Sequence, residues 1–278
     1  MPLPIADTRP LFRPLCGEIV DLLRTLGHEQ WEQPTLAGTW RIRDLVAHLV
    51  DTALRRLSLH RDGSRRPAAG IFMATDLDLV AFINDLNATW VRAAQRLSPR
   101  VLTDLYAHAS TELADFIETL PLDATAVLPV SWAGETHSVQ WLDIGREFTE
   151  VWHHGSQIRE ATGAGPFPDS HWLHAVLQIA LHAVPYAYRD VPGRPGLSVV
   201  LTITGRAPGT WALQHRDSGW EIAEGRGVNP AATATMSDEV AWRLLFNALT
   251  RADALRLIRL EGDRELALPL LRARAVVV

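Results

Sequence analysis

The chain has 278 residues, of which 47% are hydrophobic and 21% are charged. This length predicts two domains, and this composition excludes an intrinsically disordered protein. The formal net charge of −5 excludes a basic surface for nucleic acid, because such binding depends on neutralising phosphates with Lys and Arg.

Hydrophobic residues recur every three or four positions through the first two thirds of the chain, which is the spacing of one helix face. This pattern predicts helices over residues 7–31, 41–61, 76–97, 101–120, 141–162 and 171–188. The Gly-, Arg-, Ser- and Pro-containing segment 62–70 is expected to be a loop. The segment 124–138 is partly β-branched and contains Pro129 and Gly134, which predicts a hairpin or an ordered loop. Gly163 stands where the left-handed cap of the fifth helix is expected.

After Gly196 the pattern changes to short alternating or β-branched runs, as in an antiparallel meander. These runs cover residues 197–205, 210–215, 219–225 and 232–237. Helices are then expected over 238–249, 252–258 and 264–272, and the last five residues, 274–278, also fit a strand. The predicted fold class is therefore an all-α part followed by a smaller α+β part with an antiparallel sheet and helices. The domain boundary is expected near residue 192, which gives domains 1–191 and 192–278.

No stretch approaches the roughly 18 consecutive apolar residues of a membrane span, so no membrane partner is expected. A single cysteine, Cys16, cannot form an internal disulfide, and the first residues lack the order of a secretory signal. These features predict a cytoplasmic protein. Cys16 lies among apolar residues at helical spacing, which favours a buried thiol over a nucleophile.

Three residues are candidates for a metal site. His48 lies between apolar residues in the second predicted helix, where a lone histidine is more often a satisfied core residue than a ligand. Glu150 and His154 lie four residues apart in the fifth helix, so they project from one face and could close on one cation. On spacing alone, a simple Glu–His surface pair fits at least as well.

The surroundings of Glu150 favour the metal site. Its neighbours Phe148, Val151 and Trp152 are bulky and apolar, and an unpaired carboxylate is costly to bury among them. Together with His48, the pair would supply three protein ligands and leave an open position on a divalent metal. Zinc, nickel, iron and manganese would all be acceptable to this set of ligands.

Two long segments carry a family resemblance. PTLAGTWRIRDLVAHLV (34–50) and WLDIGREFTEVWHHGSQIREATG (141–163) resemble the mycothiol-dependent maleylpyruvate isomerase family, within a superfamily of damage-inducible four-helix metalloproteins. LTITGRAPGTWALQ, SDEVAWRLLFNAL and LEGDRELALPLL resemble the family's C-terminal domain, which has a sterol-carrier-like fold. The resemblance spans nearly the whole chain and implies an N-terminal four-helix bundle.

The resemblance also implies a set of ligands and a reaction. In the family, the histidine of the V-A-H-L helix and the E-x-x-x-H pair bind a divalent metal, often zinc, and these positions fall on His48, Glu150 and His154. Zinc is therefore the first choice here and nickel the second. The family's best-described reaction is isomerisation of maleylpyruvate with mycothiol as the thiol cosubstrate, and relatives are thought to transfer the thiol to other electrophiles. Many members have an acidic residue where this chain has Gln157, which puts the substrate in question.

Other side chains are assigned to the surroundings of this site. Gln157, one turn beyond His154, is expected to contact metal-bound water or to hydrogen-bond a ligand, as part of the cofactor-binding site. The adjacent His153 is expected either to contact the ligands without binding the metal or to lie at the surface. Trp40 is expected to be a packing residue. Arg243 is expected to meet a substrate carboxylate because a guanidinium binds one bidentately; the alternative is a solvated or intradomain arginine.

The first functional hypothesis is a metal-dependent enzyme, a transferase or isomerase that uses mycothiol on a small electrophile. The partners are then two small molecules, and the protein is expected to be a monomer or a homodimer. One alternative is a non-catalytic protein that binds a lipid or small ligand in its C-terminal domain. Others are a metal-dependent hydrolase, which would act without an added thiol, and a protein that only senses or stores metal.

Overall fold

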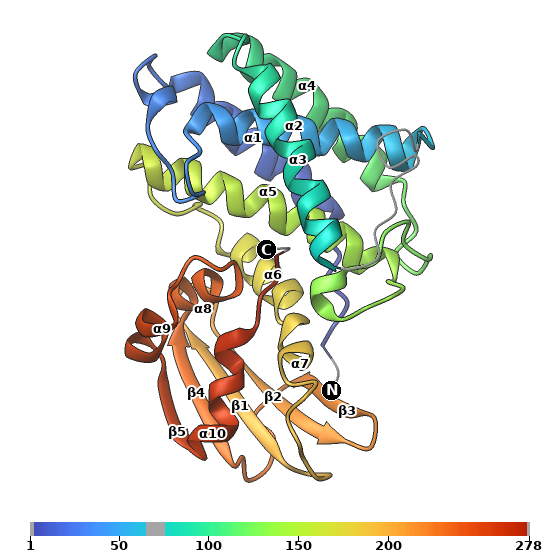
Figure 1. The fold of residues 1–278 in the computed structure, drawn as a ribbon, viewed down its shortest axis with the longest axis vertical. Helices are drawn as coiled ribbons and strands as arrows, with labels where there is room; N and C mark the ends of the chain where they lie inside the picture. Colours follow the sequence, from blue (N-terminus) through green and yellow to red (C-terminus); the bar gives the residue numbers. More distant parts are fainter. Residues whose placement is uncertain (1–2, 65–75, 277–278) are drawn as a thin grey trace. The chain divides into compact units, whose positions relative to one another are not determined.

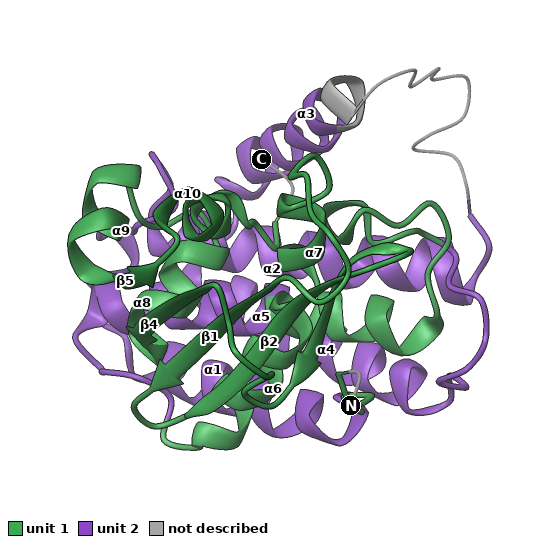
Figure 2. Cartoon of the chain, turned by 90° about the horizontal axis from the view of Figure 1, so that it is seen from below, with its two compact units in different colours: residues 1–7, 128–149, 168–277 green, residues 8–127, 150–167, 278 purple. Residues whose placement is uncertain are grey.

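The computed structural model describes residues 3–64 and 76–276. Figure 1 labels the helices and strands, and Figure 2 colours the two compact units into which the chain divides. One, here called the helical unit, contains residues 8–127 and 150–167. The other, here called the sheet unit, contains residues 1–7, 128–149 and 168–277. Within the described part of the chain, no helix is long and apolar enough to cross a membrane.

The helical unit consists of long helices. They are α1 (Arg9–Thr25), α2 (Ile42–Arg56), α3 (Asp76–Ala94), α4 (Pro99–Glu118) and the second half of α5 (Gln140–Thr162). Helix α4 packs against both α1 and α2, and α3 packs against α2. Their apolar faces supply a core of fully buried side chains, among them Phe12, Leu15, Ile19, Ile42, Leu45, Leu49, Leu102 and Ile117. The helical periodicity of the sequence therefore corresponds to the buried faces of these helices.

The helix ends differ in detail from the prediction. After α1 a separate 3-10 turn, Gln30–Glu32, follows, and α2 continues into a π-helical turn, Leu57–Arg61. Gly163 ends α5 with a φ of +71°, as its predicted cap position requires. Most of the predicted loop 62–70 lies outside the described residues.

The segment 124–138 is an ordered loop, one of the two predicted forms. It contains a 3-10 turn, Ser131–Ala133. The backbone N–H of Val130 donates to Ser138 Oγ at 2.8 Å, which holds the two sides of the turn together.

The sheet unit contains, among the described residues, a five-stranded sheet in the order β3-β2-β1-β4-β5. The strands are β1 (Ser198–Thr204), β2 (Gly209–Arg216), β3 (Gly219–Glu224), β4 (Ala232–Ser237) and β5 (Arg259–Gly262). The helices are α6 (Ser170–Ala180), α7 (Ala183–Ala187), α8 (Asp238–Leu245), α9 (Arg251–Leu257) and α10 (Arg264–Ala267), which continues into a 3-10 turn, Leu268–Arg272. Helix α7 packs on β3, α8 on β1 and β4, and α10 on β4.

The predicted fold class is confirmed, but the sheet is mixed and not antiparallel throughout. Strands β1 and β4 are parallel, with Val199 opposite Ala232, whereas the other neighbouring pairs are antiparallel. The described residues of the expected last strand, 274–276, form no strand. Strand β5 was not predicted; it lies at the sheet edge and is mostly exposed, so its sequence lacks the alternation of a half-buried strand.

The compact units do not follow the expected boundary near residue 192. Helices α6 and α7, which precede it, belong to the sheet unit. Tyr188 Oη donates to the carbonyl oxygen of Leu266 at 2.9 Å, and Trp220 Nε1 donates to that of Val191 at 2.9 Å. These bonds tie the segment before residue 192 to the sheet and its helices. The division into domains 1–191 and 192–278 stays a prediction.

The predicted helix 171–188 is interrupted between α6 and α7, at His182. The His182 ring meets the Trp141 ring edge-on, with centroids 5.4 Å apart. Burial lowers the pKa of His182 to about 4. The side chain is therefore neutral in the folded protein at pH values where an exposed histidine is charged.

We expect the free energy of unfolding to fall as the pH drops from about 6.5, the ordinary histidine pKa, to about 4, the pKa of folded His182. In this range the unfolded chain binds a proton that folded His182 does not, so acid favours unfolding. Urea denaturation at pH 7 and pH 5 measures the effect against His182→Gln, which cannot titrate. The acid-induced loss of stability should be smaller in the variant by about 2 kcal/mol. An equal loss in both proteins would contradict the assignment.

Candidate metal centre

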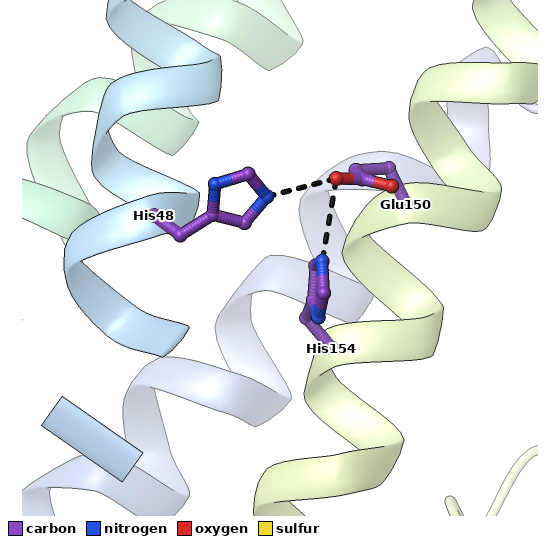
Figure 3. Close-up of side chains that lie close together, drawn as sticks. All are labelled: His48, Glu150 and His154. Atoms are coloured by element: carbon purple, nitrogen blue, oxygen red, sulfur yellow. Dashed lines mark hydrogen bonds and ion pairs between the residues drawn. The ribbon is translucent and has the colours of Figure 1, made fainter. Parts of the chain in front are cut away.

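Three side chains converge in the helical unit, as Figure 3 shows: His48 from α2, and Glu150 and His154 from α5. His48 Nε2 lies 2.9 Å from Glu150 Oε1, and His154 Nε2 lies 3.3 Å from the same oxygen. One donor atom from each residue lies within 4.8 Å of the others. The structure therefore brings together the three residues that the sequence analysis selected.

Local structure explains how these side chains are placed. The backbone N–H of Arg41 donates to Asp44 Oδ2 at 2.9 Å, which fixes the start of α2 before His48. On α5, Glu150 and His154 are separated by one turn and share a face. The side chain of His48 is 5% exposed and that of His154 is 11% exposed, whereas that of Glu150 is 32% exposed. Solvent therefore reaches the cluster mainly at the carboxylate.

The cluster stabilises a charged carboxylate. Burial alone would raise the pKa of Glu150, but the charge and hydrogen bond of His154 and the hydrogen bond of His48 bring it well below its usual value. Burial opposes charge on His154 too, yet Glu150 raises its pKa. His48 differs, because burial dominates and lowers its pKa. The cluster therefore favours an ionised carboxylate, and it favours protonation of His154 over protonation of His48.

The donor atoms fit a divalent transition metal. Two imidazole nitrogens and one carboxylate oxygen are a common ligand set for zinc sites with an open position. Metal–ligand bonds of about 2.0–2.1 Å place neighbouring tetrahedral ligands roughly 3.3 Å apart. The two separations measured from Glu150 Oε1, 2.9 and 3.3 Å, are close to that value. His48, Glu150 and His154 could therefore hold one cation.

Comparison with known proteins gives the family. Residues 12–159, more than half of the chain, match the family described as "Mycothiol maleylpyruvate isomerase N-terminal domain". The chain belongs to this family. The resemblance seen in the sequence is thereby confirmed. A search of curated proteins found no match.

Solved structures show the same fold. A structure of the mycothiol-dependent maleylpyruvate isomerase is 13% identical with a TM-score of 0.52, and a mutant with one histidine changed to alanine is 13% identical with a TM-score of 0.51. Each match covers 87% of this chain and 88% of the other. A sterol carrier protein 2 like 2 from Aedes aegypti is 20% identical, and the match covers 34% of this chain and 97% of that chain. Its TM-score of 0.26 is too low to show a common fold. The sterol-carrier-like fold of the C-terminal part stays a prediction.

Trp40, in the loop before α2, packs on the cluster. Its ring centroid lies 5.0 Å from that of His48 and 6.5 Å from that of His154. The indole is half-buried and shields both imidazoles. Packing was the role expected for Trp40, but nothing in the sequence pattern indicated that it would pack on the predicted ligands.

Gln157 and His153 lie directly beside His154. Gln157 Oε1 is 2.8 Å from His154 Nδ1, and Gln157 Nε2 is 3.2 Å from His153 Nε2. The rings of His153 and His154 stack with centroids 5.1 Å apart. Burial, aided by the charge of His154, lowers the pKa of His153 to about 3. The spacing of four residues between His153 and Gln157 was visible in the sequence and could have indicated their contact.

Arg243 lies on α8 in the sheet unit. Its Nε donates to Glu239 Oε1 at 2.7 Å, and its guanidinium lies 4.6 Å from the centroid of the Trp242 ring. The side chain is therefore engaged within its own helix. Its expected role toward a substrate carboxylate stays a prediction.

We expect Cys16 to be unreactive in the native protein. It is buried in α1, and burial raises the pKa of its thiol to about 11, so almost no thiolate is present at pH 8. Dithionitrobenzoate should release no thionitrobenzoate from the native protein over a period in which the denatured protein reacts completely. Rapid stoichiometric reaction of the native protein would show that the thiol is accessible.

Proposed function

We propose that the protein is a cytoplasmic, metal-dependent enzyme that uses mycothiol on a small electrophile, as an isomerase or a transferase. Membership of the family supports the thiol chemistry. The observation that carries the metal dependence is the convergence of His48, Glu150 and His154. Zinc is the proposed metal and nickel the second choice, because this donor set accepts both.

The proposed site suits an anionic sulfur ligand, because His48, Glu150 and His154 would hold a cation with an open coordination position. Bound to these residues, a divalent cation would lower the pKa of a thiol and supply a thiolate at neutral pH. Glu150 balances part of the positive charge, since its lowered pKa keeps it ionised. Trp40 and the burial of His48 limit contact of water with the imidazole, while the exposed part of Glu150 leaves the carboxylate open to small molecules.

The external thiol provides a simple route to both reactions. Its sulfur forms a bond to one alkene carbon of a maleylpyruvate-like electrophile, and the alkene electron pair moves to the conjugated carbonyl. Rotation about the former carbon–carbon double bond, which is single in the adduct, and return of the electron pair with expulsion of the sulfur give the other isomer and regenerate the thiol. If the adduct takes up the thiol proton on carbon, the sulfur stays attached and the reaction is a transfer. Buried Cys16 cannot replace the external thiol.

The test measures turnover of maleylpyruvate by zinc-loaded protein, with and without mycothiol, beside protein treated with a chelator. Conversion that needs both zinc and mycothiol is expected. Turnover with zinc but without thiol would overturn the thiol chemistry and favour the hydrolase. Failure to bind zinc, nickel or manganese after reloading would overturn the metal dependence and favour a ligand-binding protein.

Arg243→Ala should leave the metal content unchanged and lower kcat/KM for a substrate that bears a carboxylate. A hydrogen bond to a charged group contributes about 1.5–3 kcal/mol, so a fall of roughly 10–100-fold, mainly through KM, is expected. Glu239→Gln is the matched control, because it removes the partner of Arg243 but keeps the guanidinium. An unchanged KM in Arg243→Ala would rule out contact with the carboxylate.

A further inference from the structure

Two hydrogen bonds link the proposed ligand His154 to Gln157 and Gln157 to His153. The first joins His154 Nδ1 to Gln157 Oε1 at 2.8 Å, and the second joins Gln157 Nε2 to His153 Nε2 at 3.2 Å. All three residues are buried and all three come from α5, where the spacings of three and four residues place them on one face. Bulk water therefore competes little for these bonds.

The amide of Gln157 fixes the direction of both bonds. An amide oxygen only accepts, so the proton of the first bond is carried by His154 Nδ1. An amide nitrogen only donates, so His153 Nε2 is the acceptor of the second bond, and neutral His153 carries its proton on Nδ1. The reverse amide orientation would require a lone pair on His154 Nδ1. Neutral His154 would then carry its proton on Nε2, the nitrogen that faces Glu150, and could not use that atom as a ligand.

We propose that Gln157 is a positioning residue that holds His154 in the ring orientation and tautomer that present Nε2 to Glu150 and to a cation. His153 in turn holds the amide in the orientation that this role needs. The inference rests on the proposed function and deepens it. Each end of the amide already bonds an imidazole, so Gln157 acts through His154 and not by direct contact with the thiol.

The second proposed imidazole ligand is placed in a different way. His48 Nδ1 is buried and makes no hydrogen bond within the part of the chain that the structure describes. Its ring is held by packing, with the Trp40 centroid 5.0 Å away and the His154 centroid 4.8 Å away. A substitution at position 157 should therefore disturb His154 and leave His48 in place.

Two variants separate the functions of the amide. Gln157→Met has a similar shape and removes both hydrogen bonds, whereas Gln157→Glu keeps an acceptor for His154 and removes the donor to His153. Gln140→Met is the matched control, because Gln140 is another buried glutamine of α5 whose amide bonds Asp143. Long-range 1H–15N NMR of the imidazoles in metal-free protein reports the proton on His154 Nδ1. Zinc affinity is measured by competition with a chelator.

We expect a slowly exchanging proton on His154 Nδ1 in the wild type, in Gln157→Glu and in Gln140→Met, and its loss in Gln157→Met. Removing such a partner of a ligand typically costs 10–100-fold in metal affinity, so zinc binding by Gln157→Met should weaken by roughly that factor. Gln157→Glu should keep most of the affinity. The proposal is overturned by an unprotonated Nδ1 in the metal-free wild type, or by equal zinc affinity in Gln157→Met and Gln140→Met.

The NMR measurement needs no metal, so it separates this inference from the proposed function. If the wild type binds no zinc but shows the Nδ1 proton and loses it in Gln157→Met, the proposed function fails and the positioning of His154 by Gln157 stands. If zinc binds and the proton is absent, the reverse holds.

Discussion

If the proposed function is right, replacing His154 with alanine will prevent most zinc binding and, with it, the thiol-dependent activity. The variant loses one of the three proposed donors and also the partner that lowers the pKa of Glu150. Its zinc affinity should fall by more than the roughly 10–100-fold typical of a residue that only supports a ligand. Elemental analysis after dialysis and the mycothiol-dependent assay measure the two losses, and circular dichroism should show that the helices persist.

His174→Ala is the matched control for this experiment. His174 lies on α6, in the sheet unit, and is not among the residues that converge on Glu150. Should His154→Ala fail to fold, Glu150→Gln provides the second test, since it keeps the side-chain shape and removes the negative charge. Unaltered zinc content in His154→Ala or in Glu150→Gln would mean that the cluster is not the metal site.

The helices of the bundle could be predicted because their cores come from local patterns. Leu15 and Ile19 of α1, and Leu45 and Leu49 of α2, are spaced four residues apart and are fully buried. The contact of His48 with Glu150, by contrast, joins residues 102 positions apart. Periodicity gives the buried face of each helix but not its partner. The apolar surroundings of His48 and Glu150 suggested that the two belong to one site, and the family resemblance supported that combination.

The sheet was predictable in its strands but not in its topology. Val199, Val200 and Leu201 of β1 are all buried, and β1 lies between a parallel and an antiparallel neighbour. A run of buried apolar residues indicates a central strand, but it does not give the direction of the strand beside it. The parallel pairing of β1 with β4 depends on the path of the connecting chain, which no short motif encodes.

The placement of Trp40 and Gln157 also required the structure. Trp40 lies in a loop, where no period predicts a direction for the side chain. Gln157 was found in the sequence as the residue one turn beyond His154, and this position fitted either a contact with the ligand or a contact with the metal-bound water. The distances to His154 and His153 decide in favour of hydrogen bonds to both imidazoles.

Gly155→Val should destabilise the protein by roughly 1–3 kcal/mol, the usual cost of overpacking a core. A Cβ at position 155 would lie 2.7 Å from Ile19 Cδ1 of α1 and 2.8 Å from Phe167 Cζ, both closer than van der Waals contact. Valine adds two further methyl groups, so α5 must move away from α1 or both side chains must be displaced. Urea denaturation measures the change in the free energy of unfolding.

Gly17→Val is the matched control, because Gly17 is an exposed helical glycine and a Cβ at position 17 would meet no neighbouring atom within 4 Å. Its stability should be unchanged or slightly raised, since valine has a better helix propensity than glycine. Equal stability of Gly155→Val and the wild type would contradict the close contact of α5 with α1.

The same substitution tests how packing supports the proposed metal site. Gly155 follows His154 directly and precedes Gln157 by two residues, so a shift of α5 at this point moves a proposed ligand and the residue that positions it. Zinc affinity should therefore fall together with stability in Gly155→Val and stay constant in Gly17→Val. A destabilised Gly155→Val protein with wild-type zinc affinity would show that the ligand geometry is held by the hydrogen bonds of Gln157 alone. We expect both the stability and the zinc affinity of Gly155→Val to fall, because the turn of α5 that packs on Ile19 is the turn that carries His154.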